Sequence, residues 1–279
     1  MNAMGTKGDM HMRQIGFIGA GNMGSAIIRG VVADGFVKAH QIMIYDTSRK
    51  RMEELAGEMP GLITASGAME LALHCDMIVL AVKPHLLQGV LDDIHPAVGG
   101  KAVISIAAGW TVSMLADALA GTGATYLRVM PNTPAMIGEG MTALCDDSNF
   151  TKEDFAFAKG MFDAVGRTII LPEKLFDGVI AISGSSPAYV FMMIEAMADG
   201  GVKEGLPRAC AYEMAAQAVL GAALLVLSSG THPAALKDAV CSPGGTTIEA
   251  VEELERKGFR AAIMDAMAAC AQKSRDMSK

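Results

Sequence analysis

Long runs of positive charge are absent from this sequence. It has 23 Lys and Arg against 30 Asp and Glu, a formal net charge of −7, and its densest basic run is the tripeptide at residues 49–51. Nucleic-acid-binding proteins usually gather Lys and Arg into a patch or stripe. The charge balance therefore argues against a nucleic acid as a partner.

Cysteine is scarce and shows no pairing pattern. The number of cysteines is odd, none forms a Cys-x-x-Cys pair, and all lie scattered among apolar neighbours. They are Cys75, Cys145, Cys210, Cys241 and Cys270. A disulfide framework normally has an even number of cysteines, so a reduced setting is expected. The predicted localisation is cytoplasmic.

Metal-ligand and nucleophile motifs are also missing. None of the six histidines has the His-x-x-x-His or His-x-x-Glu spacing that places ligands together on a helix face. No Gly-x-Ser-x-Gly precedes a helix, and neither Ser185 nor Cys241 has an identifiable base. We therefore expect neither a metal site nor a covalent nucleophile.

No uninterrupted apolar run is long enough to span a bilayer. The longest nearly apolar stretch, residues 218–227, has about half of the roughly 20 residues that a crossing requires. It is interpreted as a buried helix, and no membrane is expected as a partner. Residues 1–12 lack the apolar core of a signal peptide and are interpreted as a tail.

Apolar residues are plentiful. They make up 51% of the 279 residues, whereas only 19% are charged. This length suits two domains of ordinary size. The composition predicts extensive burial, including burial between subunits.

The first half of the chain alternates short apolar runs with amphipathic segments. This rhythm is typical of a parallel, doubly wound α/β sheet. The expected strands are "IGFI", "IMIY", "MIVLAV", "AVISIA" and "TYLRV". A helix with Thr151 as its cap and Glu153 and Asp154 in its first turn follows, and a last strand-like run, "RTIIL", ends at Pro172.

The chain after Pro172 is predicted to be all helical. Pro207 and Pro233 suit first-turn positions. The second helix is apolar nearly all round, so it is expected to be buried between subunits. The expected helices span residues 186–204, 207–227, 233–239, 246–257 and 259–273. The predicted domains are therefore an α/β domain over 13–171 and an all-α domain over 172–279.

A glycine-rich loop follows the first expected strand and opens a helix. In "IGFIGAGNMGSAI", Gly19 permits a tight turn, Gly21 lets backbone approach a pyrophosphate, and Gly24 lets helix and strand pack closely. The spacing predicts a Rossmann dinucleotide-binding domain. The alternative is a glycine-rich packing turn without a ligand.

The identity of the nucleotide is less clear from the residues. Asp46 ends the second strand about 20 residues after Gly24, where an acidic residue favours a free ribose 2′-hydroxyl. Ser48 and the basic residues 49–51 are instead able to surround a 2′-phosphate, although they also fit a solvated helix start. NADPH is the preferred prediction, and NADH remains the alternative.

Loops after later strands add candidates at the same sheet edge. "AVKP" follows the strand that begins "MIVL", "IAAGW" the one that begins "AVIS", and "VMPNTP" the one that begins "TYLR". Lys83 suits either a cofactor contact or an ordinary surface position. Asn132 and Thr133 form a rigid polar corner between two prolines, which favours a ligand role over a capped turn.

The segment "CSPGGTTIEA" interrupts the helical half. Its two glycines let backbone N–H groups approach a carboxylate, and the following helix start adds partial positive charge. The alternative is that Ser242 caps a helix whose first residue is Pro243.

These motifs together resemble the pyrroline-5-carboxylate reductase family over nearly the whole chain. The resemblance is carried by "GFIGAGNMGSAI", "AVKP", "MPNTPA", "DGGVKEGLPR" and, most specifically, "LKDAVCSPGGTTIEAVEELE". Departures from the family pattern are Ile180, Ala181 and Ser186 in place of a Thr and two glycines, Cys241 in place of Ser, and Asp46 near a position that is often Asn.

The resemblance implies an NAD(P)H-dependent oxidoreductase acting on a CH–NH bond, which makes L-proline in the last step of proline biosynthesis. It also implies a homodimer with interleaved helical domains that complete the active site, and further assembly into rings such as a decamer. Alternatives are a related imine or β-hydroxyacid dehydrogenase and a non-enzymatic nucleotide sensor. A hydroxyacid enzyme should have a helix lysine as acid/base, and "SGSSPAYVF" has none.

Site residues follow from matching positions in the motifs. Thr247 and Ser242 are the expected catalytic residues, with Thr247 orienting the substrate nitrogen, and Gly244, Gly245 and Thr246 are the expected substrate contacts. The expected cofactor contacts are Gly19, Gly21, Asn22, Met23, Gly24, Ser48, Arg49, Ala81, Val82, Lys83, Pro84, Ala107, Ala108, Asn132 and Thr133.

Overall fold

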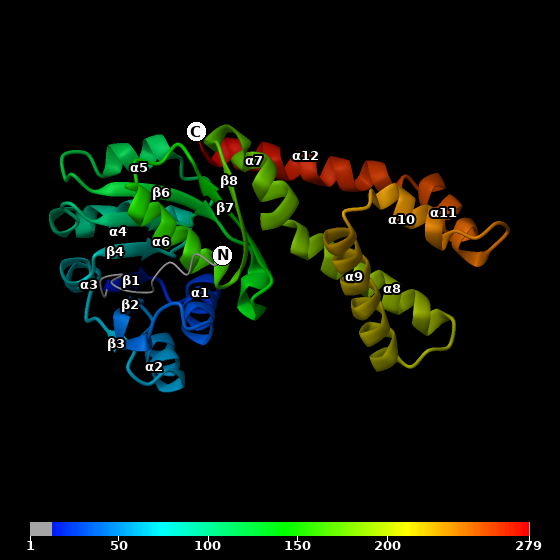
Figure 1. Cartoon of the computed structure of the whole chain (residues 1–279), viewed down its shortest axis with the longest axis horizontal. Helices are drawn as coiled ribbons and strands as arrows, with labels where there is room; N and C mark the ends of the chain where they lie inside the picture. The colour runs from blue at the N-terminus through cyan, green and yellow to red at the C-terminus, as the bar shows by residue number, and fades with distance from the viewer. Residues whose placement is uncertain (1–12, 279) are drawn as a thin grey trace, which may run out of the picture. The chain divides into compact units, whose positions relative to one another are not determined.

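The structure, a computed structural model, describes residues 13–278 (Figure 1). The tail predicted over residues 1–12 lies outside the described residues. Internal contacts divide the chain into two compact units. One contains the chain up to Gly184 together with the segment from Ala271 onward, and the other is Ser185–Cys270. The first unit therefore extends past the predicted boundary after residue 171 into the first helical turns.

An eight-stranded sheet forms the centre of the first unit. The strand order is β3-β2-β1-β4-β5-β6-β7-β8, and all neighbours are parallel except β6 and β7. The strands are β1 (Ile15–Ile18), β2 (Ile42–Tyr45), β3 (Ile63–Thr64), β4 (Met77–Leu80), β5 (Ala102–Ser105), β6 (Thr125–Met130), β7 (Gly140–Cys145) and β8 (Gly166–Leu171). The predicted doubly wound, mostly parallel sheet is confirmed.

Helices cover both faces of this sheet (Figure 1). They are α1 (Asn22–Ala33), α2 (Arg49–Glu58), α3 (Ala68–His74), α4 (Pro84–Ile94), α5 (Val112–Ala118), α6 (Lys152–Asp163) and α7 (Phe176–Val179). One core cluster joins Phe17 to Ile27 of α1 and Phe162 of α6, and a second joins Ile78 to Leu87 of α4. Burial on both faces explains why β1, β4 and β5 are continuous apolar runs.

Several short elements were not predicted from the sequence. Strand β7, "GMTALC", is antiparallel to β6 and parallel to β8, and its residues do not alternate because nearly all are buried. A π-helical turn, Ile180–Gly184, follows α7. Short 3₁₀ helices span Ala39–Gln41, His95–Ala97, Thr133–Ile137 and Glu173–Leu175.

The second unit is helical, as predicted. Its helices are α8 (Ser186–Lys203), α9 (Arg208–Ser229), α10 (Pro233–Val240), α11 (Thr246–Arg256) and α12 (Phe259–Met277), of which α12 continues into the first unit. Helices α8 and α9 pack against each other. Pro233 is the first residue of α10, whereas Pro207 lies one position before α9 instead of in its first turn.

Residues 218–227 are mostly exposed in the single chain, so the expected burial of this helix between subunits stays a prediction. They belong to the 22-residue helix α9, whose buried residues are Ala211 and Ala215, while Leu224 and Leu225 are each 51% exposed. The helix itself was predicted over residues 207–227, close to its observed bounds. Two helical stretches, Glu173–Lys203 and Arg208–Ser229, are long and apolar enough to cross a membrane. This is weak support for a span, because length and composition alone do not distinguish lipid from a protein partner.

Candidate active site

The glycine loop lies between the ends of three strands. Gly19 has φ +107°, and its amide donates to the carbonyl oxygen of Tyr45 at 2.7 Å. A Cβ at position 19 would stand 2.5 Å from the carbonyl oxygen of Ala81. Both the positive φ and this close approach require glycine, so β1, β2 and β4 meet at a turn that a side chain would disrupt.

The next two glycines differ in their surroundings. Gly21 precedes α1, and a Cβ there would meet nothing within 4 Å, so the space beside the helix start is open. A Cβ on Gly24 would stand 2.2 Å from the carbonyl oxygen of Gly19. No side chain caps α1, which leaves the first amides of the helix facing this space with their partial positive charge. The geometry suits a pyrophosphate.

Asp46 is tied to backbone on both sides. Its Oδ2 accepts the amide N–H of Ala20 at 2.8 Å, and its Oδ1 accepts the amide N–H of Ser48 at 2.8 Å. The Asp46 side chain is only 9% exposed. The carboxylate therefore joins the end of β2 to the middle of the glycine loop.

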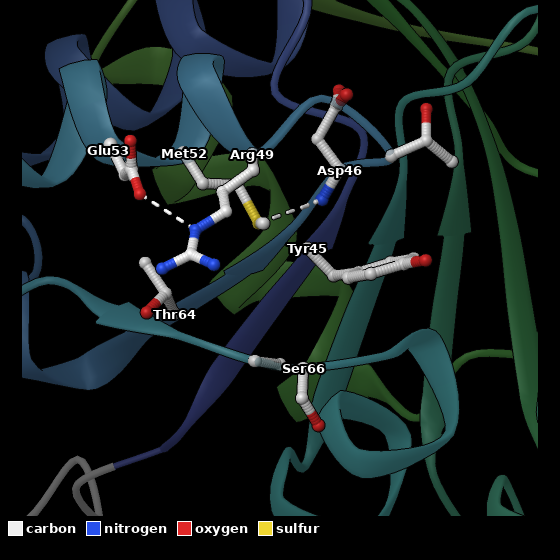
Figure 2. Close-up of a pocket in the computed structure, with 9 residues that line it drawn as sticks. Tyr45, Asp46, Arg49, Met52, Glu53, Thr64 and Ser66 are labelled. Atoms are coloured by element: carbon white, nitrogen blue, oxygen red, sulfur yellow. Dashed lines mark hydrogen bonds and ion pairs between the residues drawn. The ribbon is translucent and has the colours of Figure 1, made fainter.

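A cavity of about 530 Å³ lies beside Asp46 (Figure 2). Such a volume is within the range of small-molecule sites. Arg49 reaches into it from the first turn of α2 and donates its Nε to Glu53 at 2.8 Å. Ser48 is the N-cap of α2, and its hydroxyl accepts the amide N–H of Arg51 at 3.5 Å. The lining residues are Tyr45, Asp46, Thr47, Arg49, Met52, Glu53, Thr64, Ala65 and Ser66.

The basic residues of α2 fit both sequence-based interpretations. The side chains of Arg49 and Lys50 are 87% and 85% exposed and pair with glutamates one turn further along the helix. They therefore fit the interpretation as a solvated helix start. Arg49 also lines the cavity, as a contact with a 2′-phosphate would require.

Two further loops leave the same sheet edge. Lys83 is the exposed residue before α4, and Pro84 is the first residue of that helix. The indole N–H of Trp110 donates to the carbonyl oxygen of Pro84 at 3.0 Å, which joins the loops after β4 and β5. The amide of Ala107 donates to the buried hydroxyl of Ser105 at 3.3 Å. Strand order reverses between β1 and β4, where ligands of such folds bind.

Asn132 is buried and already bonded at both ends of its amide. Its Nδ2 donates to the carbonyl oxygen of Ser183 at 3.0 Å, and its Oδ1 accepts the amide N–H of Met141 at 2.8 Å. The side chain thereby joins the end of β6 to β7 and to the π-helical turn. Thr133, in contrast, is exposed. A cofactor contact by either residue stays a prediction.

The segment from Ser242 to Thr247 lies in the second unit, between α10 and α11. The amide of Gly245 donates to the carbonyl oxygen of Ser242 at 3.0 Å, and Gly244 has φ +65°, so the four residues form a β-turn that needs glycine. Helix α11 begins at Thr246 with Gly245 before it and without a side-chain cap. The alternative in which Ser242 caps a helix beginning at Pro243 is therefore wrong.

The start of α11 is able to bind an anion. Its first amides have no capping side chain, and the hydroxyls of Ser242 and Thr247 flank the turn. A Cβ on Gly245 would stand 2.3 Å from the Ser242 hydroxyl oxygen, so a side chain there would force that hydroxyl to rotate away. Hydroxyls and free amides together suit a small carboxylate.

An ion pair between buried Arg128 and partly buried Glu173 was missed from the sequence. Arg128 of β6 donates to Oε1 of Glu173 at 2.7 Å, and the same oxygen accepts the amide N–H of Val112 at 2.6 Å. The guanidinium also lies over the ring of Phe176, 4.8 Å from its centroid. The feature of the sequence that could have indicated this ion pair is Arg128, a single charged residue in the otherwise largely apolar strand β6.

Other reactive chemistry finds no support in the described part of the chain. Between residues 13 and 278, no three His, Cys, Asp or Glu side chains gather in a way that could hold a metal ion. Burial raises the pKa of the Cys75 thiol to about 12 and that of Cys145 to about 11. Both thiols stay protonated at neutral pH and are poor nucleophiles.

Comparison with known proteins agrees with this geometry. A family model described as pyrroline-5-carboxylate reductase dimerisation matches residues 173–277, and one described as NADP oxidoreductase, coenzyme F420-dependent, matches residues 14–109. The pyrroline-5-carboxylate reductase of Escherichia coli K12 is 48% identical over 96% of this chain and 99% of its own length. That of Arabidopsis thaliana is 41% identical over 95% of this chain and 96% of its own.

A solved structure extends the likeness to three dimensions. The crystal structure of Plasmodium falciparum pyrroline carboxylate reductase with NADP bound has a TM-score of 0.88 and 35% identity, and covers 96% of this chain and 98% of that one. Sequence identity of this level over nearly the full length of both chains shows common descent. The chain belongs to the pyrroline-5-carboxylate reductase family.

Proposed function

We propose that the protein is a pyrroline-5-carboxylate reductase that uses NADPH to reduce 1-pyrroline-5-carboxylate to L-proline, the last step of proline biosynthesis. The observation that carries the proposal is the 48% identity to the Escherichia coli enzyme over 96% of this chain. The open glycine loop and the uncapped start of α11 are the two local features that the reaction requires.

The chemistry needs few catalytic groups. A bound nicotinamide cofactor supplies a hydride, which adds to the imine carbon while the ring nitrogen takes a proton. The imine is readily protonated near neutral pH, so no strong general base is needed. The residues of the chain have to orient the substrate, bind its carboxylate and exclude water.

We assign carboxylate binding to the turn between α10 and α11. The first amides of α11 and the hydroxyl of Ser242 hold the substrate carboxylate, with Gly244, Gly245 and Thr246 forming the surrounding backbone. Thr247 orients the ring nitrogen through its hydroxyl and assists protonation there. Ser242 and Thr247 act as the catalytic residues of this turn.

We assign cofactor binding to the carboxyl edge of the sheet. The start of α1 receives the pyrophosphate, and Ser48 and Arg49 receive the adenosine 2′-phosphate beside the cavity. The loops after β4, β5 and β6 line the nicotinamide. The assigned residues are Gly19, Gly21, Asn22, Met23, Gly24, Ala81, Val82, Lys83, Pro84, Ala107, Ala108, Asn132 and Thr133.

The proposed assembly is a homodimer with interleaved helical domains, which assembles further into a decamer. Half-exposed leucines on α9 support an interface with a second copy, because apolar surface of this kind needs cover. The dimerisation match at residues 173–277 supports it as well. We propose that these helices face protein instead of lipid, and that the enzyme works in the cytoplasm.

One assay tests the activity. Purified protein is given 1-pyrroline-5-carboxylate or a β-ketoacid, and consumption of NADPH and NADH is followed separately by absorbance. The proposal expects consumption with the cyclic imine and L-proline as product. Turnover of the ketoacid alone would instead identify a hydroxyacid dehydrogenase, and cofactor binding without turnover of either would favour a nucleotide sensor.

A further inference from the structure

Asp46 occupies the position from which an acidic residue usually recognises the adenosine ribose. In dinucleotide-binding folds, a carboxylate at the end of the second strand accepts the ribose 2′-hydroxyl and disfavours a 2′-phosphate. Taken alone, this position predicts preference for NADH. The hydrogen bonds of Asp46 indicate a different role.

Each carboxylate oxygen of Asp46 already accepts a backbone N–H. One bond goes to Ala20, which lies between Gly19 and Gly21, and the other goes to Ser48, the cap of α2; both measure 2.8 Å. Charged, well-buried hydrogen bonds of this length are the strong kind. These two bonds fix the orientation of the carboxylate, so a ribose hydroxyl would be limited to the remaining lone pairs. Turning the carboxylate toward the ribose would break both bonds and leave the buried amide of Ala20 without this acceptor.

The charge of Asp46 is also partly offset on the side of the cavity. Arg51 places a guanidinium nitrogen 3.9 Å from Oδ1 of Asp46. Arg49 reaches into the same cavity, and the start of α2 adds its partial positive charge (Figure 2). Glu53 is the other carboxylate in the lining, and it pairs with Arg49.

We propose that Asp46 is a positioning residue that fixes the glycine loop, and that it does not select the cofactor through the ribose. Its carboxylate holds the Ala20 amide so that the loop keeps the conformation in which pyrophosphate binds. Discrimination between NADPH and NADH then belongs to Ser48 and Arg49. This inference rests on the proposed use of a nicotinamide cofactor.

The variant Asp46→Asn separates the two roles. Asparagine has the same size, but its Nδ2 is unable to accept an N–H, so one of the two backbone bonds is lost. Dissociation constants for NADPH and NADH are measured by fluorescence titration without substrate. A positioning role predicts that both rise by the same factor, roughly tenfold, with their ratio unchanged.

The matched control is Asp76→Asn. Asp76 also accepts a backbone N–H, that of Gln14 at 2.9 Å, but at the opposite end of the same sheet. This variant should bind both cofactors as the wild type does. In steady-state assays Asp46→Asn should raise KM for both cofactors while kcat changes by less than about twofold.

Two results would overturn the proposal. A selective loss of NADH affinity in Asp46→Asn would make Asp46 a ribose ligand, and unchanged affinity for both cofactors would show that its bonds to the loop do not matter. Absence of imine reduction by the wild type would refute the proposed activity instead, while the binding comparison would still be informative.

Hydrogen exchange of the wild-type protein tests the same idea without a variant. The amides of Ala20 and Ser48 should be protected in the free protein and stay protected with saturating NADPH or NADH. Faster exchange at these two amides on adding NADH would mean that the carboxylate turns to the ribose. That result would contradict the positioning role even if Asp46→Asn failed to fold.

Discussion

The two glycines at the start of α1 allow a matched pair of substitutions with opposite outcomes. In Gly24→Ala the new methyl group would stand 2.2 Å from the carbonyl oxygen of Gly19 and 3.2 Å from the Cβ of Ala81. In Gly21→Ala it would meet no protein atom within 4 Å. We expect the first change to lower stability and the second to weaken cofactor binding.

The magnitude follows from local packing. Backbone at 2.2 Å has to move, and such overpacking costs about 1–3 kcal/mol. Because the close neighbour is backbone and not a flexible side chain, the cost lies in the upper part of this range, about 2–3 kcal/mol. Replacing glycine inside a helix returns roughly 1 kcal/mol. Gly24→Ala should therefore lose about 1–2 kcal/mol net, which corresponds to a fall of about 2–8 °C in the melting temperature.

Gly21→Ala should leave the fold nearly unchanged. Its φ of −72° and ψ of −173° are accessible to alanine, so the expected loss is that of a helix cap, about 0.5–1 kcal/mol. The methyl group would fill the space that a pyrophosphate needs, which should raise the cofactor dissociation constant at least tenfold.

Calorimetry and cofactor titration on both variants check the pair. The reasoning is refuted if Gly21→Ala binds NADPH as tightly as the wild type, because the open space would then not be the binding site. It is equally refuted if Gly24→Ala melts at the wild-type temperature, since the backbone at Gly19 would then move away from the new methyl group at no cost in stability.

Four further outcomes are expected. Thr247→Ala should lower kcat by roughly one to two orders of magnitude with an unchanged melting temperature, and wild-type rates would remove Thr247 from the mechanism. Arg49→Ala should weaken binding of NADPH more than binding of NADH, as titration would show; equal losses would place the 2′-phosphate elsewhere. Glu173→Gln leaves the charge of Arg128 buried without its partner and should cost about 3 kcal/mol by calorimetry, whereas Glu54→Gln, in an exposed pair with Lys50, should cost less than about 1 kcal/mol. Burial raises the pKa of Cys75 from 9.0 to about 12, so its thiol should resist alkylation at pH 8 while the exposed Cys210 reacts. The raised pKa also makes the free energy of unfolding depend on pH: the contribution of the protonated thiol is complete below pH 9 and should be lost as the pH rises toward 12.

The sheet was predictable because parallel strands are buried on both faces. Such strands are continuous apolar runs in the sequence. Strand β1 matches the expected "IGFI", and β4 and β5 are the first four residues of the expected "MIVLAV" and "AVISIA". Strand β7 escaped because it begins with glycine and has no alternation, and its antiparallel pairing with β6 departs from the rhythm of the preceding strands. Its presence depends on contacts distant in sequence.

The positions of the helices were predictable from the sequence, but the groups that pack against their apolar faces were not. The second apolar helix appears as α9, yet its leucines are half exposed in the single chain, because none of residues 13–278 buries them. Composition predicts that apolar surface has to be buried, and it does not say whether the cover is the same chain or a second copy.

The polar residues at the strand ends show why the site was only partly predictable. Sequence position placed Asp46 and Asn132 at the cofactor edge, and the structure keeps them there. Their side chains, however, accept the backbone N–H groups of Ala20, which is buried, and Met141, which is partly buried. An irregular loop has to satisfy its own N–H groups before it binds a ligand, and a short polar side chain nearby is the least costly acceptor. A motif therefore identifies which loop binds, whereas the hydrogen bonds decide which of its side chains remain available to the ligand.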